Sequence, residues 1–238
     1  MLLLTACTSH EHQAYNPLQQ PYTMPAAYGN SYFSYQASVP HPEYYDLPFQ
    51  QVPGYHLTGL RFPSSEQNGQ PGNLVDARYF RSNRSGSKPL LIVLPVWATH
   101  TFPAMVISNG YTQHSDGEAN VLWLKGDGAL FDWFKLAKID NEAEFTHEVE
   151  QATERFRAVA IDTRRLIDWA ETQPEIDSSR IAIIGFSMSA IVGANVAGTD
   201  SRINTAVYVL GGARPWDLMA ECNLFVQYMR TQVCAYLD

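Results

Sequence analysis

The chain has 238 residues, of which 45% are hydrophobic and 17% charged, and its formal net charge is -8 at pH 7. This length suggests one or two domains and allows a sizeable buried core. The acidic balance, with no stretch rich in Lys and Arg, argues against nucleic acid as a partner. A negative net charge mainly supports solubility and does not indicate a substrate.

The N-terminal segment, residues 1–7, ends in Leu-Thr-Ala-Cys. It resembles a bacterial lipobox, in which the signal peptide is cleaved before a cysteine that then receives lipid. The resemblance implies an exported lipoprotein of the bacterial cell envelope, anchored to the membrane through Cys7. Only six residues precede Cys7 and none is basic, whereas a secretory signal needs a basic start and an apolar stretch of about 7–15 residues. Either the true start lies upstream or the match is incidental.

Residues 8–54 are predicted to be a low-complexity linker. They are rich in Gln, Pro, Tyr, Ser and Asn, and they contain no Lys or Arg. Seven prolines between Pro17 and Pro53 exclude a long helix. Because neither a two-residue nor a 3.6-residue apolar periodicity is present, we expect a largely disordered, partly extended tether.

The folded domain is predicted to span residues 55–238. Two strand candidates, 55–62 and 74–80, are separated by a loop rich in Ser, Asn, Gly and Pro. Their spacing suits an antiparallel pair at one edge of a sheet. The elements predicted next are a buried strand at 88–97, a helix from about residue 103, and a strand at 120–124.

The clearest predicted helix spans residues 142–172. Its apolar residues recur at steps of three and four, opposite a charged face: Phe145, Val149, Ala152, Phe156, Val159, Thr163, Leu166, Ile167 and Ala170. This stripe indicates core packing, so it is assigned no cofactor. A later buried strand is predicted at 204–210, and the stretch from Pro215 is predicted to be helical. Strands that alternate with helices predict a three-layer α/β fold around a mainly parallel sheet.

Residues 180–198 contain the most specific functional pattern. A β-branched apolar run leads into Gly185-Phe186-Ser187-Met188-Ser189, and a stretch of small residues follows. This order predicts a strand, a sharp turn and a closely packed helix, which is the context of a G-x-S-x-G nucleophile elbow. Ser187 would have a strained backbone that only small residues at 185 and 189 allow. Ser189 replaces the last glycine of the pattern, and an ordinary strand followed by a polar turn is the alternative.

From about Leu74 to about Gly212 the chain resembles the α/β-hydrolase superfamily, in particular its dienelactone-hydrolase and esterase-like branch. The resemblance rests on the elbow and on the Asp-x-x-Arg-Ile turn that begins at Asp177. It implies that Ser187 cleaves an ester or related acyl bond of a small-molecule substrate. It also implies an oxyanion hole formed by the backbone N–H groups of Met188 and of Trp97 or Ala98, with Gly185 and Ser189 supporting the elbow.

In this superfamily the acid and the histidine of the triad follow the serine in the chain. All seven histidines here precede Ser187, and the chain stops at Asp238. The resemblance therefore implies an α/β-hydrolase sheet that lacks its last strands, with activity impaired by loss of the C-terminal acid and histidine. The exposed sheet edge would favour self-association. His100 is a conceivable base at a displaced position in the chain; the alternative is a loop histidine exposed to water. Asp217 is a conceivable acid; the alternative is a residue that begins the last helix.

Two other functions remain open: a non-catalytic, membrane-anchored binding lipoprotein, and a relative of the prolyl-type peptidases, which use similar elbows. No cofactor and no metal are expected. The three cysteines and the scattered histidines show no zinc-site spacing. Gly126-x-Gly128 lacks the further glycines and the helix context of a phosphate-binding loop.

Overall fold

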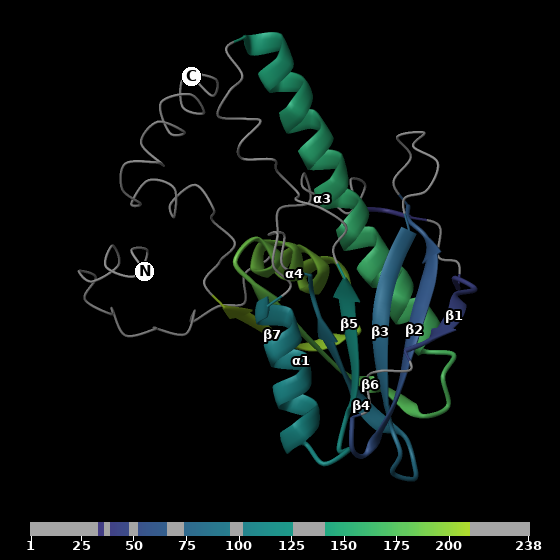
Figure 1. The fold of residues 1–238 in the computed structure, drawn as a ribbon. Helices are drawn as coiled ribbons and strands as arrows, with labels where there is room; N and C mark the ends of the chain where they lie inside the picture. The colour runs from purple at the N-terminus through teal and green to yellow at the C-terminus, as the bar shows by residue number, and fades with distance from the viewer. Residues whose placement is uncertain are drawn as a thin grey trace, which may run out of the picture. The chain divides into compact units, whose positions relative to one another are not determined.

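The computed structural model describes residues 33–35, 39–47, 52–65, 74–95, 102–125 and 141–209. In chain order the elements of this part are β1 (Glu43–Asp46), β2 (Tyr55–Pro63), β3 (Leu74–Ser82), β4 (Lys88–Val93), α1 (Phe102–His114), β5 (Asn120–Lys125), α3 (Glu142–Ala170), β6 (Ile176–Phe186), α4 (Met188–Thr199) and β7 (Ile203–Val209) (Figure 1). No helix in these ranges is both long and apolar enough to cross a lipid bilayer.

The seven strands form one mixed sheet in the order β1-β2-β3-β5-β4-β6-β7. Strands β5, β4, β6 and β7 are mutually parallel, whereas β1, β2 and β3 pair antiparallel with one another and β3 pairs antiparallel with β5. The carboxyl ends of β4 and β6 therefore lie side by side at the same end of the sheet. Ser187 directly follows β6 at this end.

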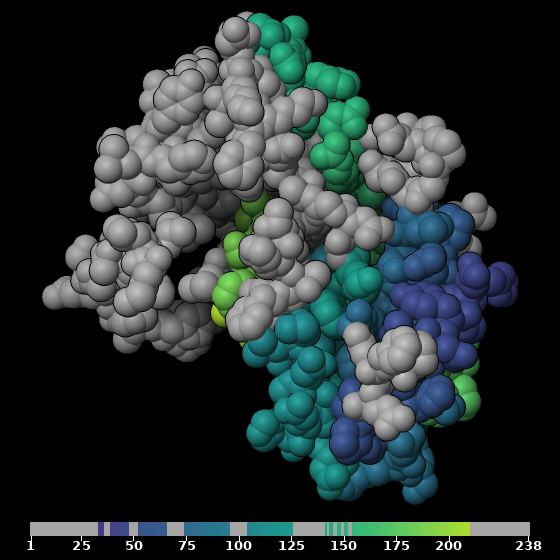
Figure 2. All heavy atoms as spheres, viewed as in Figure 1, coloured from purple at the N-terminus to yellow at the C-terminus, as the bar shows by residue number. Residues whose placement is uncertain are grey.

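Helices cover both faces of the sheet and produce three layers (Figure 1). The larger core cluster joins the sheet to α3 and α4, and includes Ile183, Leu166 and Val192, which are fully buried. The smaller cluster lies under α1 and includes Val121 and Trp123. In Figure 2 the side chains of α1 (teal) form the outer surface of the layer that covers the smaller cluster. Burial of each large apolar side chain contributes about 1.5–3 kcal/mol, so the core holds the strand ends in fixed positions.

The predicted α/β architecture is confirmed, with one strand that the pattern did not reveal. The pair β2–β3 is antiparallel as expected, but it does not form the sheet edge, because β1 pairs with β2 on the outer side. β1 lies within the stretch predicted to be a linker. Its docking depends on Gly59 of β2, which lies opposite Tyr45, because a Cβ at Gly59 would overlap the Tyr45 ring.

Tyr45 also joins β1 to a buried carboxylate on β3. Its hydroxyl donates to Asp76 at 2.5 Å, and Arg61 donates to the other oxygen of Asp76 at 2.9 Å. The Arg61 guanidinium lies 4.8 Å from the centre of the Tyr45 ring. Burial of the hydroxyl, together with its hydrogen bond to Asp76, raises the pKa of Tyr45 to about 12. The folded chain therefore favours the protonated phenol.

Polar contacts fix α3 against the end of β2. Asp162, which is buried, accepts hydrogen bonds from the Ser64 hydroxyl and from the Ser65 backbone N–H, the latter at 2.8 Å. Arg165, one turn further along α3, donates to the Pro63 carbonyl at 2.7 Å. The orientation of α3 on the sheet is thus set by hydrogen bonds as well as by the apolar stripe.

At the edge of the sheet opposite β1, β7 is the outermost strand in the described part of the chain. Val207 and Tyr208 are 43% and 42% exposed. Residues 210–238 lie outside the described ranges, so the expected exposed edge and the self-association through it stay predictions.

We predict that the free energy of unfolding falls as the pH rises from about 10 towards 12, and that it falls less in Tyr45→Phe. The unfolded tyrosine ionises near pH 10 and the folded one near 12, so the stability from this group is fully present below pH 10 and is lost above it. Urea unfolding of both proteins at several pH values measures the difference. An identical pH dependence in the two proteins would contradict the assignment.

Candidate functional site

Ser187 occupies the turn between β6 and α4 with an unusual backbone conformation. Its φ is 57° and its ψ is -124°. Among the non-glycine residues in the described ranges, only Ser187 and Asp116 have a positive φ. Such a conformation costs on the order of 1–3 kcal/mol and persists only where the surroundings enforce it. The Ser187 side chain is exposed, so the strained turn presents a hydroxyl to solvent.

Three neighbouring groups enforce this turn. The backbone N–H of Ser187 donates to the carbonyl of Val209, at the end of β7, at 2.8 Å, and Ala190 N–H donates to the Ser187 carbonyl at 2.9 Å. Gly185 supplies the space: a Cβ there would overlap the Ser189 carbonyl group and lie 2.7 Å from the nitrogen of Ala190. A larger residue at 185 is therefore incompatible with the turn.

Ser189 has a role that the sequence pattern did not predict. It is fully buried, and its hydroxyl donates to the backbone carbonyl of Pro95, just beyond β4. The same two segments are joined by a hydrogen bond of 3.0 Å from Leu94 N–H to the Ile184 carbonyl. The residue that departs from the glycine pattern thus connects the first turn of α4 to the exit of β4.

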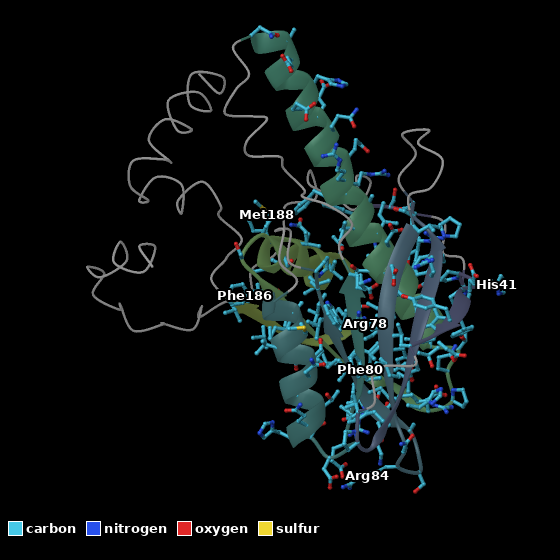
Figure 3. The ribbon with its side chains drawn as sticks, in the orientation of Figure 1. His41, Arg78, Phe80, Arg84, Phe186 and Met188 are labelled. Carbon is cyan, nitrogen blue, oxygen red and sulfur yellow. The ribbon has the colours of Figure 1, made fainter. Side chains whose placement is uncertain are left out.

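Small residues let α4 pack closely on the sheet. A Cβ at Gly193 would lie 3.3 Å from the Leu94 side chain and 3.5 Å from the Tyr208 ring, while Val192 and Val196 are fully buried. This packing fixes the helix N-terminus at the end of β6. Figure 3 labels Phe186 and Met188, the residues on either side of Ser187 at this junction.

The N-terminus of α4 favours a negative charge beside the serine. Met188 is the first helical residue, and the first backbone N–H groups of a helix have no intrahelical partner. The first turn contains no acidic residue, and the Ser187 side chain does not cap the helix. The Ala190 N–H is bonded to the Ser187 carbonyl, so the helix dipole and the Met188 N–H are what can stabilise an anion that develops next to Ser187.

The topology places this turn where open α/β sheets bind ligands. The connection after β4 leads to β5 on one side, whereas the connection after β6 leads to β7 on the other side. Ligands of such sheets bind in the crevice where neighbouring connections diverge in this way, at the carboxyl ends of the strands. Ser187 and the exit of β4 both lie at this switch point.

None of the four histidines in the described ranges forms a hydrogen bond with Ser187. His41 lies before β1, five strands away from β6, and Figure 3 labels it at the right, across the molecule from Phe186 and Met188. His56 and His114 lie near the amino ends of the parallel strands, and the His114 ring bonds the Gly110 carbonyl at 2.7 Å. His147 is exposed on α3. These side chains are not placed to deprotonate the serine.

The other predicted site residues lie outside the described ranges: Cys7, Trp97, Ala98, His100 and Asp217. Their roles in lipidation, the oxyanion hole and catalysis stay predictions. In the part of the chain that the structure describes, no group of three or more His, Cys, Asp or Glu side chains could hold a metal ion.

The three-layer fold and the strand–serine–helix turn define an α/β hydrolase, which confirms the superfamily that the sequence resembles. A profile of the phospholipase/carboxylesterase family matches residues 97–225, more than half of the chain. The chain belongs to this family.

Two solved structures show the same fold. The chain is similar to acetyl xylan esterase 1 from a Thermoanaerobacterium species (TM-score 0.50, 20% identity), over 81% of this chain and 60% of that one. It is also similar to acetyl xylan esterase from a Paenibacillus species (TM-score 0.54, 15% identity), over 83% of this chain and 62% of that one. The chain thus spans about three-fifths of the length of each enzyme. No curated protein matches the sequence.

We predict that Gly185→Ala lowers the free energy of unfolding by about 1–3 kcal/mol, because the new methyl group overlaps the backbone of the elbow. Gly198→Ala is the matched control: it lies on α4, and a Cβ there has nothing within 4 Å. The control should be neutral or stabilising by about 0.5–1 kcal/mol, as expected for alanine in a helix. Urea unfolding compares the two, and equal effects would contradict the steric role of Gly185.

Proposed function

We propose that the chain is a serine esterase in which the Ser187 hydroxyl is the nucleophile, acting on a small-molecule ester or a related acyl compound. The principal support is the backbone of Ser187, with φ at 57°, at the switch point of a sheet in a chain of this family. The esterase names of the similar structures agree with this class of reaction. They do not indicate the acyl or alcohol group of the substrate.

The proposed reaction proceeds through an acyl-enzyme. Ser187 Oγ forms a bond to the carbonyl carbon of the ester while its proton passes to a base, and the carbonyl oxygen becomes an oxyanion. The Met188 N–H and the N-terminus of α4 stabilise this negative charge. The C–O bond to the alcohol then breaks, and the alcohol takes the proton from the base. Water attacks the acyl-enzyme in the same way, releasing the acid and restoring Ser187.

The base is the limiting part of this proposal. A serine hydroxyl is a weak nucleophile unless a base activates it, and none of the described histidines bonds Ser187. We propose His100, which follows β4 in the chain, as the base available in these 238 residues. Without a base, the oxyanion hole and binding alone leave roughly 10³–10⁴-fold catalysis over water. If His100 does not serve as the base, we propose that these 238 residues alone form an esterase impaired to that level.

We predict that a fluorophosphonate forms a covalent adduct with the full chain at Ser187. A one-to-one increase in intact mass, absent in Ser187→Ala, would support an assembled nucleophile. Ser201→Ala is the control variant, because Ser201 is another exposed serine, in the turn before β7. Absence of the adduct in a chain shown by circular dichroism to be folded would reject the nucleophile assignment.

Labelling, hydrolysis and binding measurements separate the alternative bases and functions. If His100→Gln labels as fast as the wild type, His100 is not the base. Hydrolysis of acetyl esters but not of prolyl peptides separates the esterase from a peptidase. A chain that binds an ester in both wild-type and Ser187→Ala forms, without hydrolysing it in either, is a binding module.

We also propose that Cys7 anchors the chain to the membrane of the cell envelope. The support is the Leu-Thr-Ala-Cys sequence and the tether-like composition that follows it. When the full chain is expressed in bacteria supplied with radioactive palmitate, the label should be incorporated in the wild type and lost in Cys7→Ser, with Cys222→Ser as the control. Equal incorporation in the wild type and Cys7→Ser would reject the anchor.

A further inference from the structure

The segment Phe33–Tyr35 is attached to α3 by several polar contacts, although it lies far before the domain in the sequence. The Tyr35 hydroxyl lies 2.9 and 3.0 Å from the two carboxylate oxygens of Asp168 and donates its proton to this group. Arg164 donates to the Phe33 carbonyl at 2.8 Å, and its guanidinium lies 4.7 Å from the centre of the Tyr35 ring. Phe33 also packs against the larger core cluster.

Asp168 connects this segment to the end of α4. Arg202, before β7, donates to Asp168 at 2.8 Å and to Asp200 at 2.7 Å. Arg164 also lies 3.3 Å from Asp200, the residue that ends α4. The Asp168 and Asp200 side chains are only 9% and 4% exposed, so their charges interact in a poorly hydrated environment.

The arginines keep the buried carboxylate of Asp200 ionised. Burial alone would raise the pKa of Asp200, but hydrogen bonds and charge from Arg202, with a further bond from Arg164, hold its pKa below the usual value. Removing one partner from such a group leaves a buried charge uncompensated, which is far more costly than losing a surface ion pair. The contact with Tyr35 is therefore part of a closed network and not an isolated surface bond.

The same N-terminal stretch contacts α3 a second time. Trp169 Nε1 donates to the Tyr44 hydroxyl at 3.1 Å, and Tyr44 belongs to β1, which pairs with β2. Trp169 in turn packs edge-on against Tyr79 of β3, with ring centres 5.2 Å apart. Phe33–Tyr35 are thus joined to the α4–β7 turn, and β1 is joined both to α3 and to the opposite edge of the sheet.

We propose that Phe33–Tyr35 and β1 together are an N-terminal clamp, an integral part of the domain that fixes the point at which the chain enters it. This point is Phe33, at the C-terminal end of α4, because Arg164 joins the Phe33 carbonyl to Asp200. Ser187 lies at the other end of this helix, whose twelve residues extend about 18 Å. A force on the chain before Phe33 therefore reaches the domain at the end of α4 farthest from the serine.

Hydrogen exchange of the full chain tests the coupling. In Tyr35→Phe, amide exchange should accelerate about tenfold or more, as expected for loss of a hydrogen bond to a charged group. The acceleration should occur together in three regions: the N-terminal stretch (33–35 and 39–47), residues 157–170 of α3, and the turn 200–202. Tyr111→Phe is the matched control, because the Tyr111 hydroxyl forms no hydrogen bond within the described ranges. Faster exchange confined to residues 33–35, or equal changes in the two variants, would overturn the clamp.

A double-mutant cycle with conservative substitutions and a distance measurement complete the test. The effects of Tyr35→Phe and Arg202→Lys on the unfolding equilibrium should be non-additive, since both side chains bond Asp168. With the three native cysteines replaced by serine, spin labels at Ser34→Cys and Ser201→Cys should lie closer together than labels at Ser34→Cys and Ser187→Cys. Additive effects, or the reverse order of distances, would overturn the proposal. Neither measurement depends on hydrolytic activity.

Discussion

The close contact between the start of α4 and the end of β6 is the constraint on which the site depends. It requires a residue without a side chain at 185, because any Cβ there meets the Ser189 backbone. It also gives Ser187 its positive φ and places the N-terminus of α4 at the same point. The fully buried side chains of α4, which hold the helix on the sheet, thus determine whether the serine stays in its strained conformation.

Ion pairs and apolar packing act together on α3. Its apolar stripe supplies the burial energy, but the stripe alone would permit the helix to slide or rotate on the sheet. Hydrogen bonds remove that freedom: Asp162 and Arg165 bond the end of β2, and Asp168 bonds the α4–β7 turn. The carboxylates of Asp162 and Asp168 are both nearly excluded from water. Because a buried charge requires its own partner at a defined distance, these contacts specify one arrangement of the helices.

Most of the fold could be predicted from local patterns, while the contacts between distant segments could not. Strand and helix positions between residues 55 and 209 follow from apolar periodicity, and the serine turn follows from five adjacent residues. β1 has no such pattern: only four residues long, it is stabilised by Gly59, Asp76 and Arg61, which lie 13 to 33 residues away. The link from Ser189 to Pro95 spans 94 residues, and only the tertiary structure brings the two groups together.

The hydroxyl at position 189 has a consequence for finding related proteins. A search that requires glycine four residues after Gly185 would pass over this chain, although the turn that glycine normally permits is present here. In this chain a small side chain is accommodated because its polar atom has an acceptor on the neighbouring strand exit. A hydroxyl side chain at this position can therefore take the place of the glycine when a backbone carbonyl at the exit of the preceding parallel strand accepts its hydrogen bond.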